Sequence, residues 1–276
     1  MFPMLIDLGT HDLPFLGETP IFLPTYGVLY ATAVILAWAW FSHRAKGMDI
    51  GPDLRFNLCF YTLLAGILGA KLLLIVLDWR VYLQHPGEIF GTLRSAGVLA
   101  GGVIAGAVTF VLYSRRHGLP TWRLADAIAA PLVLAQSVGR LGCFSAGCCW
   151  GVGVSPDAAF SSTFTDPVAH AQTGVPLNLP LAPVQLIEMG ADLFLVAVLT
   201  LLWRRRPEPP GTVFWLYLLL YSTARGVIEF WRGDVHRGMY FGNQVSTSQL
   251  FAMAAALLAL VMLVRGLRSR QAISSP

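Results

Sequence analysis

Apolar residues in this chain form long runs that are separated by short polar loops. Seven runs can be recognised, each near the ~20 residues that cross a bilayer as a helix. They cover residues 26–40, 56–77, 98–113, 124–138, 184–203, 213–228 and 248–264. Hydrophobic residues make up 55% of the 276 positions and charged residues only 12%, which is too apolar for a water-soluble domain. The pattern predicts an all-α integral membrane protein with seven transmembrane helices.

The placement of lysine and arginine predicts the orientation of these helices, because basic loops stay on the cytoplasmic side. Twelve of the 19 basic residues follow the first, third, fifth or seventh run: Arg44, Lys46, Arg55, Arg115, Arg116, Arg123, Arg204, Arg205, Arg206, Arg265, Arg268 and Arg270. The N-terminus is therefore predicted outside and the C-terminus in the cytoplasm. The net charge of +4 reflects this topology, so no nucleic-acid partner is expected.

The chain is interpreted as a single membrane domain over residues 1–276 with one sizeable insertion. Between residues 142 and 183 the sequence becomes rich in Ser, Thr, Asp, Pro and Gly. A short apolar piece at 160–164 within it could pair as a brief strand. The pattern predicts a small extracytoplasmic cap between the fourth and fifth helices.

Arg140 is the first candidate functional residue. It closes the apolar run 124–138 and opens the glycine- and cysteine-rich run 139–151. A guanidinium at membrane depth is costly unless an anion meets it, so an intramembrane arginine indicates a functional site. In a bilayer the abundant candidate anion is a phospholipid phosphate. The glycines that surround Arg140 are expected to let the chain turn sharply there, with backbone amides able to bind phosphate.

A second polar group lies on the sixth helix. Tyr217, Tyr221, Arg225 and Glu229 follow at four-residue spacing and therefore share one helix face. They could form an ordinary ion pair beside an interfacial tyrosine belt. Against that, more charged and hydrogen-bonding residues follow directly: Arg232, Asp234, His236 and Arg237. This concentration favours a site near Arg140.

Taken together, these motifs resemble the prolipoprotein diacylglyceryl transferase family along nearly the whole chain. The similar segments are Tyr26-Gly27, the run 101–106 that starts with Gly101-Gly102, the run 139–151 around Arg140, the run 182–188, and the run 221–232 around Arg225. The Gly139-Arg140-Leu141-Gly142 block is the most specific of them.

This resemblance implies transfer of the diacylglyceryl group of phosphatidylglycerol to the lipobox cysteine thiol of prolipoproteins, with release of glycerol 1-phosphate. That reaction is the first step of bacterial lipoprotein maturation. The expected location is the bacterial inner membrane, with the active site toward the outer leaflet, and the expected partners are phosphatidylglycerol, prolipoprotein signal peptides and membrane lipids. No cofactor and no metal are expected.

Roles follow from this chemistry. Arg140 and Arg225 suit the phosphate, because guanidinium pairs bidentately with phosphate oxygens. Glu229 is a candidate proton acceptor, Tyr26 is the fourth candidate catalytic residue, and His236 is a weaker candidate base. Further candidates for substrate binding are Tyr221, Gly101, Gly102, Gly142, Gly151 and Arg232. For Gly101 and Gly102, pure helix packing is an equally good explanation.

The chain departs from the family pattern at several positions. Ala100 and Ala182 stand where the family usually has histidine, and Cys143 and Cys148 replace an asparagine and a glutamate. The identity of the general base is therefore left open. Two alternatives also stay open: a related lipid transferase with another acceptor, and a non-enzymatic phospholipid-binding or transport protein.

The chain has four cysteines. Cys59 lies in an apolar run and is interpreted as an ordinary small apolar residue. Cys143, Cys148 and Cys149 are predicted to brace the turn near Arg140, as a disulfide or as packed thiols. Three cysteines without a fourth ligand match structural zinc poorly, so a zinc site is not expected.

Overall fold

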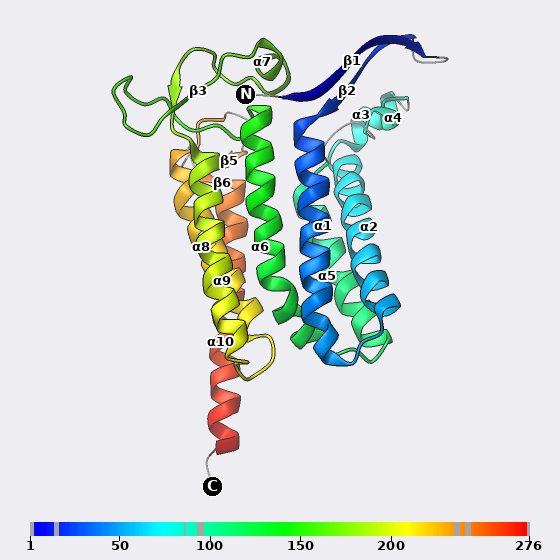
Figure 1. The fold of residues 1–276 in the computed structure, drawn as a ribbon, viewed down its shortest axis with the longest axis vertical. Coiled ribbons are helices and arrows are strands. Elements are labelled where there is room, and N and C mark those ends of the chain that lie inside the picture. Colours follow the sequence, from blue (N-terminus) through cyan, green and yellow to red (C-terminus); the bar gives the residue numbers. More distant parts are fainter. Residues whose placement is uncertain are drawn as a thin grey trace. The chain divides into compact units, whose positions relative to one another are not determined.

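The computed structural model describes residues 3–13, 17–85, 87–92, 97–234, 238–240 and 244–274 (Figure 1). The chain divides into two compact units. One unit contains Met1–Ala39 with Ala125–Pro276, and the other contains Trp40–Leu124. The boundaries fall inside helix α1 (Thr25–Ala45) and near the start of helix α6 (Thr121–Ala146).

Each of the seven predicted apolar runs lies on a long helix. Besides α1 and α6 these helices are α2 (Pro52–Leu77), α5 (Leu99–Arg116), α8 (Val184–Arg204), α9 (Thr212–Ile228) and α10 (Thr247–Ser274). Several helices extend beyond their apolar run, because backbone hydrogen bonding continues into polar end turns that hydropathy does not mark. The chain is therefore a mostly helical protein, as predicted.

Six of these helices are long and apolar enough to cross a membrane, counting only residues that the structure describes. The exception is α5, which contains three glycines and ends at Arg115 and Arg116. On α2, large aliphatic side chains such as Leu68 and Leu72 are 59% and 64% exposed, which is favourable only in contact with lipid or another protein. The chain is thus a multi-pass membrane protein.

In the unit formed by residues 40–124, α2 packs against α5 through glycines. A Cβ atom added to Gly102 would lie 2.9 Å from the carbonyl oxygen of Gly66, and one added to Gly101 would collide with the backbone of Gly69. Small residues allow such close helix contact in membranes. The unit also contains the 3-10 helix η1 (Lys46–Met48) and the short helices α3 (Trp79–Gln84) and α4 (Glu88–Gly91).

In the other unit, α6, α8, α9 and α10 are joined by polar contacts. Ser137 Oγ on α6 donates to the carbonyl oxygen of Met189 on α8 at 3.3 Å. Gln136 Nε2 on α6 lies 3.2 Å from the hydroxyl of Tyr217 on α9. Gln249 Nε2 on α10 donates to the carbonyl oxygen of Gly226 on α9 at 3.4 Å. Hydrogen bonds of this kind hold helices together where hydrophobic burial offers little advantage.

The segment before α1 forms an antiparallel hairpin of β1 (Met4–Leu13) and β2 (Gly17–Pro24). The hairpin was not predicted. The register of its strands has a bulge between Asp7 and Thr10. Leu5, Ile6 and Leu8 on β1 are about half exposed or more, at 52%, 50% and 58%. The hairpin thus presents apolar side chains at its surface.

The segment between α6 and α8 has its own small core. Strand β3 (Ser162–Thr163) pairs with β4 (Pro180–Leu181), and α7 (Pro167–Thr173) is capped by the Asp166 carboxylate. The buried core residues are Trp150, Phe164, Ala169, Val175 and Leu181. Figure 1 shows β3 and α7 together at one end of α6 and α8. The brief strand predicted within 160–164 is confirmed.

The expected sharp turn does not occur at Gly139 or Gly142. Helix α6 continues through Gly139, Arg140 and Gly142 and ends at Ala146. Neither glycine interrupts it, because a helical backbone accepts glycine at a cost of only about 1 kcal/mol. The chain turns at Gly147, whose φ is +76°. The non-helical insertion therefore begins at residue 147, five residues later than predicted.

After α9, the 3-10 helix η2 (Glu229–Trp231) leads to the hairpin β5 (Met239–Tyr240) and β6 (Val245–Ser246). This region is tied to the insertion by backbone hydrogen bonds. Val152 N–H donates to Trp231 O at 2.9 Å, and Gly233 N–H donates to Trp150 O at 3.0 Å. The insertion and the end of α9 are thus held together.

The start of α9 depends on a buried carboxylate from another helix. Asp126 on α6 is 4% exposed and accepts hydrogen bonds from the N–H groups of Gly211 at 2.6 Å and Phe214 at 2.9 Å. Removing it leaves two helix-terminal donors without this acceptor, which costs about 1–3 kcal/mol. We expect Asp126→Ala to lower the melting temperature of the purified protein in detergent. Exposed Asp157→Ala is the control, and equal melting temperatures for the two variants would contradict this role.

Candidate active site

Buried polar side chains gather on one face of α8. Gln185, Glu188 and Asp192 are 0%, 4% and 5% exposed, and their spacing of three and four residues places them on the same face of the helix. Carboxylates are rarely found inside membrane helices unless they have a partner or a function. This face of α8 turns toward α6 and α9, where the predicted arginines lie.

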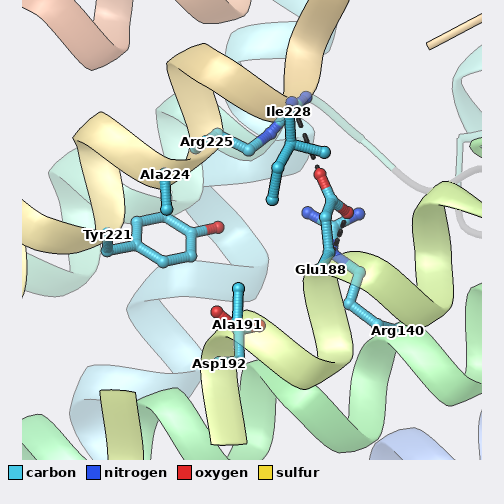
Figure 2. Close-up of a pocket in the computed structure, with 8 residues that line it drawn as sticks. All are labelled: Arg140, Glu188, Ala191, Asp192, Tyr221, Ala224, Arg225 and Ile228. Atoms are coloured by element: carbon cyan, nitrogen blue, oxygen red, sulfur yellow. Dashed lines mark ion pairs between the residues drawn. The ribbon is translucent and has the colours of Figure 1, made fainter. Parts of the chain in front are cut away.

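Glu188 contacts both of the predicted arginines. Nε of Arg140 lies 2.7 Å from Oε2 of Glu188, and Nη1 of Arg225 lies 3.4 Å from Oε1 of the same carboxylate. Figure 2 shows the carboxylate of Glu188 between the two guanidinium groups. Three helices, α6, α8 and α9, therefore meet at one side chain. The anion that meets Arg140 here is a protein carboxylate, and not the lipid phosphate that the sequence suggested.

The charged chain continues past Arg225. Oε2 of Glu229 lies 2.5 Å from Nη1 of Arg225 and 3.9 Å from Nε of Arg232. Arg232 in turn forms a two-point contact with Asp234, at 2.9 Å and 2.5 Å. Positive and negative groups thus alternate from Arg140 to Asp234, three of each sign. The contact of Arg225 with Glu229 confirms that these two residues of the predicted face lie side by side.

The ion pairs are close, but their hydrogen bonds are poorly aligned. Among the described residues, the two carboxylate oxygens of Glu188 have no hydrogen-bond partner with suitable geometry. The same holds for Nη1 of Arg225. The contact of Arg140 with Glu188 involves Nε and not the two Nη groups. A guanidinium has five N–H donors, so these arginines retain donors that another acceptor can use.

These side chains line a pocket between α6, α8 and α9. Its walls are Arg140, Glu188, Ala191, Asp192, Tyr221, Ala224, Arg225 and Ile228. In Figure 2 the hydroxyl of Tyr221 points into the space that α8 and α9 enclose. Five of these eight residues are polar or charged and three are apolar, so ionisable and hydrogen-bonding groups converge on a small space.

Two predicted residues, Tyr26 and Gly142, lie together near Arg140, with Gly142 two residues further along α6. A Cβ atom on Gly142 would lie 3.1 Å from Cδ2 of Tyr26, so the tyrosine ring packs directly on this glycine. Tyr26 is 41% exposed and stacks on Tyr30. At Gly151 the backbone passes close to the start of α8, since an added Cβ would lie 2.7 Å from Cγ2 of Val184 and would collide with Ala182.

The structure does not bring every predicted residue to this pocket. Gly101 and Gly102 lie in the α2–α5 contact of the other unit, where they serve close helix packing. His236 lies outside the described residues. Arg232 is 10% exposed and joins the charged chain through Glu229 and Asp234. Burial alone would lower the pKa of Arg232, but its hydrogen bond with Asp234 and nearby negative groups raise it.

Three cysteines lie beside this chain of charges. Cys143, Cys148 and Cys149 are free thiols, and their sulfur atoms all lie within 4.8 Å of one another. Hydrogen bonding from Cys143 and Cys148, helped by Arg232 and Arg140, lowers the pKa of Cys149. The pKa of Cys148 is raised, because its hydrogen bonds favour the thiol form. Packed thiols, one of the two expected arrangements, are what the structure contains.

Glu188 and Asp192 were not predicted as site residues, although a signal for both is present in the sequence. Each is a carboxylate inside the apolar run 184–203, and this is the same criterion that identified Arg140. Their spacing of four residues places them on one helix face. The sequence cannot indicate which arginine they meet, because that depends on how α6, α8 and α9 pack.

Comparison with known proteins shows which family the chain belongs to. The family model for prolipoprotein diacylglyceryl transferase matches residues 15–265. A phosphatidylglycerol–prolipoprotein diacylglyceryl transferase of Clostridium tetani is 32% identical over 83% of this chain and 87% of its own length. The protein of the same name from Symbiobacterium thermophilum is 31% identical over 90% of each chain. The chain therefore belongs to the prolipoprotein diacylglyceryl transferase family.

Proposed function

We propose that this protein transfers the diacylglyceryl group of phosphatidylglycerol to the lipobox cysteine of prolipoproteins and releases glycerol 1-phosphate. Its relatives are named for phosphatidylglycerol and prolipoprotein, which supports both substrates. The single observation that carries the proposal is the pair of largely buried arginines, Arg140 and Arg225, whose side chains are 18% and 13% exposed, on two sides of one pocket.

The reaction requires stabilisation of a phosphate leaving group. The acceptor sulfur attacks the glycerol carbon, the C–O bond to phosphate breaks, and the phosphate gains a second negative charge. Two guanidinium groups that approach from α6 and α9 suit this change, because preorganised cations stabilise developing charge best in a dry site. We infer that Arg140 and Arg225 bind the phosphate through N–H groups that make no well-aligned hydrogen bond to Glu188.

The remaining site residues receive supporting roles. Tyr221 is proposed to donate its hydroxyl to the headgroup from the pocket wall. Tyr26, which packs on Gly142, is proposed to border the path of the lipid, and Gly151 is proposed to allow close approach of the insertion. Gly101 and Gly102 remain proposed lipid contacts through α5. For Arg232 we propose long-range attraction of the anionic headgroup.

Glu229 was considered as a proton acceptor. Its carboxylate lies 2.5 Å from Arg225 and 3.9 Å from Arg232, so its charge is already used by two guanidinium groups. We therefore infer that Glu229 positions Arg225.

For the membrane, we propose that α5 is the seventh span and that the insertion forms a cap outside the cytoplasm. The basic loops at residues 44–55, 115–123 and 204–206 support this orientation. The N-terminus would then be outside, the C-terminus in the cytoplasm, and the pocket near the outer leaflet of the bacterial inner membrane. The arginine pair lies near the end of α6 from which the insertion departs.

The proposal is tested by incubating purified protein with phosphatidylglycerol and a synthetic lipobox peptide. We expect a mass gain of one diacylglyceryl unit on the peptide cysteine and release of glycerol phosphate. A peptide with serine in place of cysteine is the control. Binding of phosphatidylglycerol without any transfer would favour the alternative of a lipid-binding or transport protein. Transfer to a different acceptor in membrane extracts would favour a related transferase.

Replacing either arginine should nearly abolish transfer. We expect Arg140→Ala and Arg225→Ala each to lower kcat/KM by about 10²–10³-fold, the usual effect of losing one group that stabilises an oxyanion. Lysine should recover little, because it offers a point charge in place of a planar fork. Exposed Arg116→Ala is the matched control. Unchanged peptide modification by either alanine variant, measured on folded protein, would exclude the phosphate-binding role.

Loss of Glu188 should make stability depend on anionic lipid. Glu188→Gln leaves two buried arginines without their shared carboxylate, at a cost of about 3–5 kcal/mol. We expect a lower melting temperature, and a larger recovery with phosphatidylglycerol than the parent protein shows, because a bound phosphate replaces the lost charge. Zwitterionic phosphatidylcholine and the exposed variant Asp157→Asn are the controls. Equal recovery with both lipids would contradict the idea.

The seventh span has a parity test. If α5 crosses the membrane, the loops at Gly47 and Gly118 lie on the same side, because α2 and α5 together cross twice. A reporter domain fused after either residue should then be found on the cytoplasmic side of the membrane. Opposite results at Gly47 and Gly118 would show that α5 does not cross.

A further inference from the structure

The three clustered cysteines, Cys143, Cys148 and Cys149, are brought together by the end of α6. Helix α6 ends after Ala146, and Gly147 turns the chain with a φ of +76°. The Cys148 N–H then donates to the carbonyl oxygen of Cys143 at 3.1 Å. Cys149 follows with a left-handed φ of +58°. These backbone angles return the chain toward the helix end, so the cluster is a consequence of the turn.

The turn is held from outside as well. Nε2 of Gln185, a completely buried residue at the start of α8, donates to the carbonyl oxygen of Cys148 at 2.8 Å. The next residue after Cys149, Trp150, accepts a hydrogen bond at its carbonyl oxygen from the N–H of Gly233 at 3.0 Å. The sulfur atoms therefore occupy a site that two other parts of the chain fix in place. Such second-layer contacts are typical of sites whose ligands must be oriented.

The spacing of the sulfur atoms suits a thiophilic metal ion. With Zn–S bonds of about 2.3 Å, sulfur ligands of a tetrahedral ion lie about 3.8 Å apart. The three sulfur atoms lie within 4.8 Å of one another, so small side-chain rotations bring them to that distance. Zinc sites that act in catalysis have three protein ligands and one open position, unlike the four-ligand structural sites considered from the sequence.

The surrounding charges suit a complex of this kind. Three thiolates around a divalent ion carry one net negative charge. Arg140 and Arg232 both lie within electrostatic range of Cys149, and Arg140 is also near Cys143, one helical turn away on α6. The cluster is therefore next to the arginine that we assign to the phosphate.

We propose that Cys143, Cys148 and Cys149 bind a zinc ion whose fourth position takes the acceptor thiol. This inference rests on the proposed function and names the group that activates its nucleophile. None of the eight residues that line the described pocket is a histidine. A thiol bound to zinc is deprotonated by the metal, so the nucleophile needs no dedicated histidine.

The transfer step is balanced without oxidation or reduction. The acceptor thiol binds the open position as a thiolate and gives its proton to water. An electron pair on that sulfur forms the new C–S bond at the glycerol carbon. The C–O bond breaks, and its electron pair stays on the phosphate oxygen, so a phosphodiester with one negative charge leaves as a phosphomonoester with two. The product is a neutral thioether. A thioether binds the metal more weakly than a thiolate does, so water replaces it as the fourth ligand.

Metal content of the purified full-length protein is the first test. After reduction and exposure to Zn²⁺, followed by desalting, elemental analysis should give about one zinc per chain. Cys143→Ser, Cys148→Ser and Cys149→Ser should each lose most of this zinc. Cys59→Ser, which changes the fourth cysteine on α2, is the matched control and should keep it. Absence of zinc from the parent protein, or full zinc in the three serine variants, would overturn the inference.

Cobalt provides a readout of the open position that does not depend on activity. Co²⁺ in place of Zn²⁺ should give a sulfur-to-metal charge-transfer band from three thiolates. A lipobox peptide should strengthen this band by adding a fourth sulfur, whereas the same peptide with serine should leave it unchanged. A band that does not respond to the cysteine peptide would overturn the proposed role of the metal.

The test separates this inference from the proposed function. If metal-free protein, verified by elemental analysis, transfers the diacylglyceryl group at the full rate, the function stands and the zinc inference fails. If zinc binds but phosphatidylglycerol and the peptide never react, the function fails and metal binding stands. A disulfide among the three cysteines in protein that retains full activity, detected by intact mass under non-reducing conditions, would also overturn the inference.

Discussion

The pocket depends on one carboxylate, Glu188, that two largely buried arginines share. Arg140 comes from α6 and Arg225 from α9, and each guanidinium would be costly at this depth by itself. Their common contact with a side chain of α8 offsets that cost and fixes the separation of the three helices. Breaking such a buried pair typically costs about 3–5 kcal/mol, which exceeds most single helix contacts in a membrane. The contacts of Glu188 that hold the three helices together therefore also set the geometry of the pocket.

The same arrangement explains how the site can hold cations and still bind an anion. Three arginines and three carboxylates alternate from Arg140 to Asp234, so the formal charges of this series cancel. The contacts are short, yet those of Glu188 are poorly aligned as hydrogen bonds. Opposite charges offset the cost of burying each other in the membrane, and the poor alignment would leave donors for the phosphate that we propose to bind there. A fully satisfied network would bind substrate less well.

The insertion and the end of α9 complete the site from one side. Backbone hydrogen bonds join Val152 and Trp150 to the segment 231–233, and this brings Arg232 toward the cysteine-bearing turn. Close packing at Gly151 leaves no room for a side chain there. The glycine-rich block that looked like a flexible phosphate loop thus has two separate uses: an unbroken helix that carries Arg140, and a tight turn that gathers the cysteines.

The sequence by itself determined the helices and the kind of chemistry. Long apolar runs fix helices because lipid offers the backbone no hydrogen bonds, and an arginine within such a run identifies a site for the same reason. The sequence also placed Tyr221, Arg225 and Glu229 on one helix face, because residues four apart lie on the same side of a helix. Only the tertiary structure decided that Glu188 joins the two arginines, that α6 continues past Arg140, and that Gly101 packs in another unit. The contacts of Glu188 and Gly101 join segments far apart in the chain, and local periodicity carries no information about such contacts. The end of α6 was undetermined because glycine is tolerated in a helix as well as in a turn.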